Sequence, residues 1–423
     1  MQHLGTRRRA SDLSFERLIH PVGVETFLRK YWEQQPLVIP RDRADYYSEV
    51  LSAADIDSIV GFGQLKYSQL KVARSDDAGA NKIFYVDGGS TSDTNQLFHS
   101  YDQGNTLVLN FAQCYWEPAA RVCSALESFF HFPVGINVYV TPRKSQGFPP
   151  HFDEHDAFVL QIEGSKLWRL YDQGAPSREI CLNAGDLLYI PRGSVHEAHT
   201  TDAASIHVTV GVRSYTWTDL VAELLALESP RNVELQSALP VGFMNSKDAL
   251  ELIAERVPAL LRALADGTRS QDGVDRLRER LIERMRPLPE AHLQSLDQID
   301  QISPHTLLVK RQGMLCHVST QANAAEIAFP GNRMKGPAHI EPALRFIANS
   351  SEPFRVRTLP DCLSDASKVV LAKRAVREGL LRIAAQGVSH GTVQGKDLPL
   401  RSSAASASVR DGTALEDTGT DGP

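Results

Sequence analysis

Two histidines and one aspartate are the residues of this sequence whose types and spacing predict metal chemistry. His151 and Asp153 stand two positions apart, so on a strand their side chains point to the same face and can bind one metal ion. His196 comes later, after the stretch 185–193. Two imidazoles and one carboxylate that leave positions open on the metal are the ligand set of non-heme Fe(II) oxygenases. The sequence therefore predicts a metal site made by His151, Asp153 and His196.

Two further histidines leave a second ligand set open. His155 and His199 lie close in sequence to the predicted ligands, and either one could complete a four-ligand cupin site. Three protein ligands leave three positions on an octahedral ion for a cosubstrate and O₂, whereas a fourth would occupy one of them. We therefore favour the three-ligand site.

Alternating strand patterns predict a polar pocket around these ligands. The segment 136–141 alternates apolar residues with Asn137, Tyr139 and Thr141, so one face of this strand is polar. The segment 206–212 has the same alternation, with His207 and Thr209 on its polar face. Either these two side chains bind a cosubstrate, or they hydrogen-bond to each other inside the barrel.

A lysine in the next segment is a candidate anion ligand. The apolar runs 157–162 and 167–171 flank Glu163-Gly164-Ser165-Lys166, which predicts a hairpin with Lys166 beside the turn and on the same face as Trp168. An ammonium group that points inward can bind a carboxylate.

Composition sets the class of the molecule. The chain has 423 residues, of which 42% are hydrophobic and 23% charged, as in ordinary soluble globular proteins of about two to four domains. The formal net charge of -6 gives no overall attraction for nucleic acid or anionic membranes. We therefore expect neither as a partner.

The cysteines and the N-terminus indicate the compartment. The five cysteines are scattered and form no CxxC pair, which favours a reducing compartment. No apolar run follows the basic residues 7–9, and no run approaches the ~20 apolar residues of a membrane helix. We expect a cytoplasmic protein.

The motifs around the predicted ligands, taken together, resemble a known family. The matching pieces are Asn137-x-Tyr139-x-Thr141-Pro142, Ser145-Gln146-Gly147, His151-x-Asp153-x-x-Asp156, Gln161-x-x-Gly164-x-Lys166-x-Trp168 and Pro191-x-Gly193-x-x-His196-x-Ala198. This series is similar to the JmjC-domain oxygenases of the ribosomal-oxygenase type, a resemblance that covers about residues 12–385.

The resemblance implies a mixed α+β fold with a double-stranded β-helix, the jelly-roll barrel of JmjC and cupin proteins. A helical dimerisation region and a winged-helix-like C-terminal domain would follow the barrel. The expected parts are a catalytic domain with a helical entry at 12–215, the helical region at 216–300 and the winged-helix-like domain at 301–385. Outside the resemblance, the last residues are small or polar with few large apolar groups, which predicts a disordered tail at 386–423.

The resemblance also implies the cofactors. Fe(II) would bind His151, Asp153 and His196, and the cosubstrate 2-oxoglutarate would bind Lys166, with Asn137 and Tyr139 completing its pocket. O₂ would be the oxidant. One departure is Gly211, where members of the family can carry a small hydroxyl residue near the cosubstrate. A glycine has no hydroxyl group to form that hydrogen bond to the cosubstrate.

The function expected from the resemblance is hydroxylation of an amino-acid side chain in a protein or peptide. The best candidate is an arginine or histidine of a ribosomal protein, and the chain is expected to form a homodimer. One alternative is a hydroxylase of a small modified peptide, acting on Asp, Asn or another residue. A second is a cupin ligand sensor without catalysis, whose winged-helix domain binds nucleic acid.

Basic residues do gather at 355–377, but acidic residues lie among them, which favours a packing or protein-contact role for the C-terminal domain.

Overall fold

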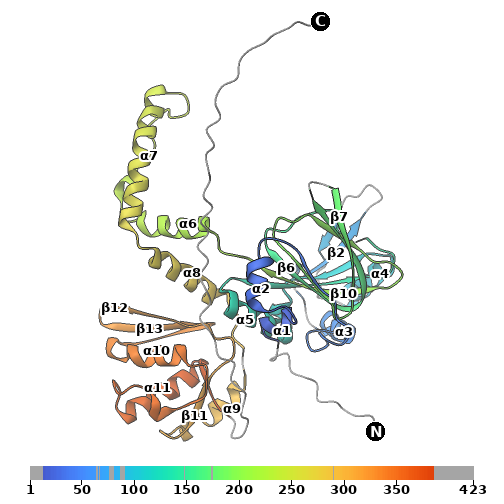
Figure 1. Ribbon diagram of the computed structural model, residues 1–423. Coiled ribbons are helices and arrows are strands. Elements are labelled where there is room, and N and C mark those ends of the chain that lie inside the picture. Colours follow the sequence, from blue (N-terminus) through green and yellow to red (C-terminus); the bar gives the residue numbers. More distant parts are fainter. Residues whose placement is uncertain are drawn as a thin grey trace. The chain divides into compact units, whose positions relative to one another are not determined.

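A computed structural model describes residues 13–62, 65, 67–75, 81–85, 91–146, 148–172, 175–288 and 290–384. In this part of the chain, an antiparallel strand system flanked by helices is followed by a helical segment and by two three-stranded sheets (Figure 1). The tail predicted at 386–423 lies outside the described residues.

The first half of the chain contributes ten strands to one hydrogen-bonded system. These strands are β1 (Leu37–Ile39), β2 (Leu70–Ser75), β3 (Asn81–Tyr85), β4 (Thr106–Leu109), β5 (Val134–Thr141), β6 (Asp156–Asp172), β7 (Ala175–Asn183), β8 (Leu187–Ile190), β9 (His196–His199) and β10 (Ser205–Val212). The helices of this half are α1 (Phe15–Ile19), α2 (Val24–Lys30), α3 (Ala53–Phe62), α4 (Thr91–Asp102) and α5 (Glu117–Phe130).

Strand β6 belongs to two parts of this system. Its first half pairs with β8 and β10, in the strand order β1-β8-β6-β10-β5-β4-β2-β3, and its second half pairs with β7 and β9. All of these pairings are antiparallel. This antiparallel pairing fits the jelly-roll barrel that the family resemblance implies.

The hairpin predicted at Glu163-Gly164-Ser165-Lys166 is wrong, because β6 runs through these residues as one strand. The pairing with β10 shifts register between Ile206 and His207, and Gly164 has a left-handed φ of 65°. A Cβ atom at this glycine would lie 1.8 Å from the carbonyl oxygen of Ala204. The turn signal thus marks a bulge at which β6 passes from one set of partners to the other.

The first half of β6 is buried on both faces. Phe158 packs against Phe15 and Phe27 on the outer face, where helices α1, α2 and α5 lie beside the strands (Figure 1). Ala157 and Val159 face the other way, into a separate apolar cluster inside the barrel. Because successive side chains of a strand alternate in direction, a strand covered on both sides reads as a continuous apolar run.

The second half of the chain is helical and then mixed. Its elements are α6 (Trp217–Glu228), α7 (Lys247–Gly267), α8 (Ser270–Arg284), α9 (His292–Asp297), β11 (Leu307–Lys310), β12 (His317–Gln321), β13 (Ala324–Phe329), β14 (Asn332–Pro337), α10 (Glu341–Asn349), β15 (Phe354–Arg355), α11 (Asp365–Arg377) and β16 (Leu381–Ile383). Strands β15-β11-β16 and β12-β13-β14 form the two small sheets, and residues of both share one core with α10 and α11. None of the described helices is both long and apolar enough to cross a membrane.

We predict that Phe158→Ala destabilises the fold by about 3–5 kcal/mol, because it leaves a cavity where a fully buried ring contacts four other aromatic rings. Urea unfolding followed by circular dichroism measures this loss. The control is Phe62→Ala, since that ring is 88% exposed and its removal should change the free energy of unfolding by less than about 0.5 kcal/mol. Equal effects of the two substitutions would contradict the assignment of the core.

Candidate metal and cosubstrate site

A cavity of about 670 Å³ opens from the inside of the barrel. Its lining includes the six residues that the family resemblance assigns to the metal and the cosubstrate: His151, Asp153, His196, Lys166, Asn137 and Tyr139. This volume lies within the usual range for small-molecule sites. The cavity has a closed end, where Lys166 is 3% exposed, and an open end, where the Asp153 side chain is 30% exposed.

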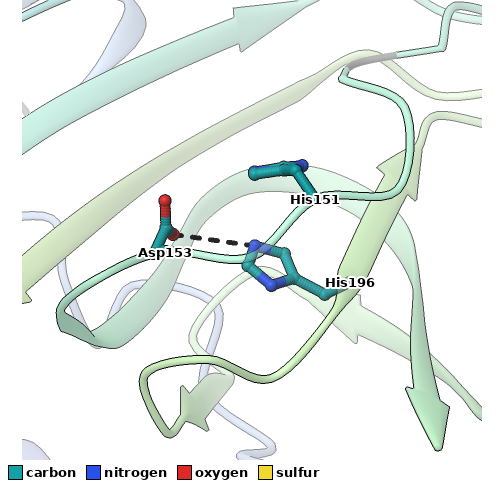
Figure 2. Close-up of side chains that lie close together, drawn as sticks. All are labelled: His151, Asp153 and His196. Carbon is teal, nitrogen blue, oxygen red and sulfur yellow. Dashed lines mark ion pairs between the residues drawn. The ribbon is translucent and has the colours of Figure 1, made fainter. Parts of the chain in front are cut away.

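The three predicted metal ligands come together at the open end. The ligand atoms of His151, Asp153 and His196 all lie within 4.8 Å of one another, and Nε2 of His196 is 3.7 Å from Oδ2 of Asp153. Figure 2 shows the three side chains converging. The backbones of His151 and His196 exchange two hydrogen bonds, of 3.0 and 2.8 Å. This antiparallel bridge holds two residues that are distant in sequence opposite each other.

Backbone carbonyls orient both imidazoles. Nδ1 of His151 lies 2.8 Å from the carbonyl oxygen of Pro149, and Nδ1 of His196 lies 2.9 Å from that of Ser194. A carbonyl only accepts, so each Nδ1 carries the proton and each Nε2 presents a free lone pair. Burial lowers the pKa of His196, which also favours the neutral form. This tautomer is the one that binds a metal through Nε2.

The donor set fits an Fe(II) ion. It has two neutral imidazoles and one carboxylate, the set typical of non-heme iron sites with open positions. Among the described residues, neither His155 nor His199 joins this group of ligand atoms. His155 lines the cavity, whereas His199 does not. The geometry therefore favours the three-ligand site over the four-ligand alternative.

The closed end of the cavity holds a lysine without a countercharge. Nζ of Lys166 donates a 3.0 Å hydrogen bond to Oγ1 of Thr141, and Thr106 donates to the same oxygen. In the described part of the chain, no carboxylate lies within ion-pair distance of Lys166. Burial lowers the pKa of Lys166 to about 7. A buried ammonium is costly unless it is paired, so this position suits an anionic ligand.

His207 and Tyr139 form the wall beside Lys166. Their rings stack with centroids 4.7 Å apart and an interplanar angle of 4°, and Trp168 packs edge-on against His207. Burial, with a smaller effect of the Lys166 charge, keeps the pKa of His207 well below its usual range. Nδ1 of His207 and Nε1 of Trp168 are buried without a hydrogen-bond partner. These orphaned polar atoms are a second sign that the closed end suits a polar ligand.

Asn137 has a structural partner as well as a place in the cavity. Its Oδ1 accepts a 3.1 Å hydrogen bond from the backbone N–H of Phe111. Burial raises the pKa of Tyr139 to about 12, so its phenol stays protonated and can donate. Both residues lie where the sequence predicted them, on the polar face of β5.

Several lining residues were missed by the sequence analysis, among them Gln113, Glu127, Arg213 and Arg284. Glu127 lies on α5, where burial raises the pKa of its carboxyl to about 7 and its Oε1 accepts from the backbone N–H of Val134. Arg284 ends α8, far from the barrel in sequence. No local pattern distinguishes these residues from ordinary surface charges, so only the fold could identify them.

Comparison with known proteins identifies the class of domain. Residues 110–220 match the family model of the JmjC domain, and they contain all six predicted site residues. The chain thus carries a JmjC domain, and the resemblance to JmjC oxygenases of the ribosomal-oxygenase type is confirmed.

Curated relatives extend the similarity beyond this domain. Mouse "Ribosomal oxygenase 2" is 34% identical over 279 residues, which cover 60% of this chain and 59% of that protein. The "Bifunctional lysine-specific demethylase and histidyl-hydroxylase NO66" of Aedes aegypti is 32% identical over 302 residues, covering 64% of this chain and 47% of that protein. The chain thus spans about three fifths of the mouse relative and about half of the mosquito one.

A solved structure confirms the fold. Escherichia coli YcfD, described as a ribosomal oxygenase in complex with cobalt and 2-oxoglutarate, aligns with a TM-score of 0.53 over 86% of this chain and 99% of YcfD, at 18% identity. The predicted barrel of the double-stranded β-helix type is therefore correct.

We predict that Asp153→Ala weakens Mn(II) binding by at least about 100-fold, because it removes the only anionic member of the ligand group. Electron paramagnetic resonance of free Mn(II) measures the affinity. Asp202→Ala is the control, since that carboxylate is 93% exposed. An Asp153→Ala protein that binds Mn(II) as tightly as the control would place the metal elsewhere.

Proposed function

We propose that this protein is an Fe(II)- and 2-oxoglutarate-dependent oxygenase that hydroxylates an amino-acid side chain of a protein. The observation that carries the proposal is the buried, unpaired ammonium of Lys166 at the closed end of a cavity whose open end presents the ligand group. An acid with two carboxyl groups matches this arrangement, with one end on Lys166 and the other at the metal.

Each residue of the site has a physical role in this proposal. His151, Asp153 and His196 would hold the metal, and Lys166 would bind the far carboxylate of 2-oxoglutarate. Tyr139 and Asn137 would line the cosubstrate. Fe(II) with 2-oxoglutarate supplies the chemistry that consumes O₂, forms succinate and CO₂, and places one oxygen atom on a C–H bond. The barrel excludes water from the closed end, where Lys166 and His207 are almost fully buried.

The substrate is proposed to be a ribosomal protein, hydroxylated on arginine or histidine. Support comes from the names of the relatives, which include ribosomal oxygenases and a histidyl-hydroxylase. The cavity is open to solvent beside Asp153, so a side chain on a surface loop of a protein can enter it. A ribosomal substrate is consistent with a cytoplasmic location.

The helical region at 216–300 is proposed to form a homodimer. On α6, Trp217, Val221 and Leu225 recur every four residues and are 78%, 53% and 43% exposed. On α7, Val257 and Leu261 are also exposed and four residues apart. Exposed apolar stripes of this kind mark interaction surfaces, and a second copy of the chain would cover them. The domain divisions at 12–215 and 301–385, with a winged-helix-like end, remain predictions.

We expect anaerobic addition of Fe(II) and 2-oxoglutarate to produce the visible metal-to-ligand charge-transfer band. Lys166→Met, which keeps the buried volume and removes the charge, should weaken 2-oxoglutarate binding by about 100-fold, since a charged partner of a buried anion is worth roughly 3 kcal/mol. Lys335→Ala, at a 68% exposed lysine, is the control. Metal binding without a band in the wild type would favour the ligand-sensor alternative.

The affinity for 2-oxoglutarate should fall as the pH rises above 7. Burial lowers the pKa of Lys166 to about 7, while His207 and Tyr139 beside it stay neutral. Above pH 7 the free protein therefore holds a neutral amine that must take up a proton to bind the carboxylate, which costs up to about tenfold in affinity per pH unit. Calorimetry in buffers of different ionisation enthalpy measures this uptake. An affinity independent of pH between 7 and 9 would contradict it.

Light scattering at micromolar concentration should give twice the chain mass of 46.7 kDa. The double substitution Val257→Glu and Leu261→Glu should yield monomers, because it places two charges in the proposed interface. Lys247→Glu, at an 88% exposed position of the same helix, serves as the matched control. A monomeric wild type would refute the dimer.

A further inference from the structure

Gly211 lies in a row of small residues that crosses three neighbouring strands. It pairs with Gly135 on β5 and with Ala157 on β6, and all three residues line the cavity. Side chains this small leave a shallow depression in the sheet surface. The depression lies on the same face of β10 as Thr209, because residues two apart on a strand share a face.

The ring of His155 fills this depression. A Cβ atom at Gly211 would lie 2.5 Å from Cδ2 and 2.7 Å from Nε2 of His155, closer than real atoms approach. Gly211 does not have a left-handed φ, so backbone conformation does not require a glycine there. A side chain at position 211 would collide with the imidazole of His155, so a glycine there leaves room for this ring.

His155 is well placed to meet a substrate. Its side chain is 34% exposed, and its Nε2 lies 4.0 Å from Oδ2 of Asp153, too far for a hydrogen bond. The ring forms no hydrogen bond to another described residue, so its nitrogens can bond to a ligand. The cosubstrate is expected at the closed end beside Lys166, whereas His155 borders the open end, through which a substrate side chain must pass.

We infer that His155, which packs against the backbone of Gly211, is a specificity-determining residue that hydrogen-bonds the target side chain beside the metal site. The inference rests on the proposed function and deepens it by naming a substrate class. Imidazole, amide and guanidinium side chains can exchange a hydrogen bond with this ring, whereas aliphatic side chains cannot. The site therefore selects a planar polar target over an aliphatic one of similar size.

The test uses the full-length protein loaded with Fe(II) and 2-oxoglutarate under anaerobic conditions. The probes are synthetic nine-residue peptides that differ only at a central His, Arg, Asn or Leu. Peptide binding is followed by the change it causes in the charge-transfer band, and turnover after O₂ is admitted is followed by the mass of the peptide.

We expect the wild type to prefer polar central residues over Leu. His155→Ala should reduce this preference about fivefold, the worth of one hydrogen bond, and should leave the affinity for 2-oxoglutarate within about twofold. Gly211→Ala should have a similar effect, because its Cβ atom displaces the ring. Combining the two should add little, since both act through the same contact. His199→Ala, at a histidine outside the cavity lining, is the matched control.

The outcomes separate this inference from the proposed function. If His155→Ala keeps the wild-type preference, or if the wild type binds no peptide better than the Leu peptide, the inference is wrong while the oxygenase assignment stands. If His155→Ala loses the band, the residue is part of the metal or cosubstrate site instead. A wild type without a band overturns the proposed function, and the inference falls with it.

The metal ligands can be counted independently of activity. In the cobalt-substituted protein, each ligating imidazole should give one strongly shifted N–H proton resonance, because its Nδ1–H is held on a carbonyl. We expect two such resonances in the wild type and in His155→Ala. Three in the wild type and two in the variant would make His155 a ligand and refute the inference.

Discussion

The burial of β6 on both faces is the constraint on which the rest of the barrel depends. One face of its first half packs against the aromatic rings carried by the entry helices, and the other closes the inside of the barrel. Its second half then pairs with β7 and β9. Because one strand takes part in both sets of pairings, the candidate ligand Asp153 just before it and Lys166 along it are fixed relative to each other. The strand thus sets the distance between the candidate metal ligands at the open end of the cavity and the lysine at its closed end.

The closed end of the cavity contains buried polar groups that have few or no hydrogen-bond partners. Lys166 is buried with one hydroxyl partner, and the polar nitrogens of His207 and Trp168 have none. Leaving such groups unpaired costs stability, and a ligand that pairs them recovers that cost on binding. The imidazoles of His151 and His196 differ from these groups, because backbone carbonyls already fix their tautomer. The cavity is therefore preorganised at the end that carries the candidate metal ligands, whereas the polar groups at its closed end lack partners.

Local patterns predicted the individual elements better than their connections. The alternation at 136–141 and 206–212 correctly indicated β5 and β10, with Asn137, Tyr139 and His207 on the cavity side. The turn signal around Gly164 was misread, because a glycine with positive φ serves a bulge as well as a hairpin. No short pattern distinguishes the two, since the difference depends on which distant strands pair with the residues on either side.

The sequence by itself determined the types and faces of the site residues: the His-x-Asp pair, His196, Lys166 and the polar strand faces. It left open which histidines come together with Asp153 and what the glycine at 211 permits. Only the tertiary structure decided these points, through the backbone bridge between His151 and His196 and the seat of His155 on Gly211. The reason is physical. Alternation along a strand depends on local geometry, whereas distances between ligands and the burial of a charge depend on contacts between residues far apart in the chain.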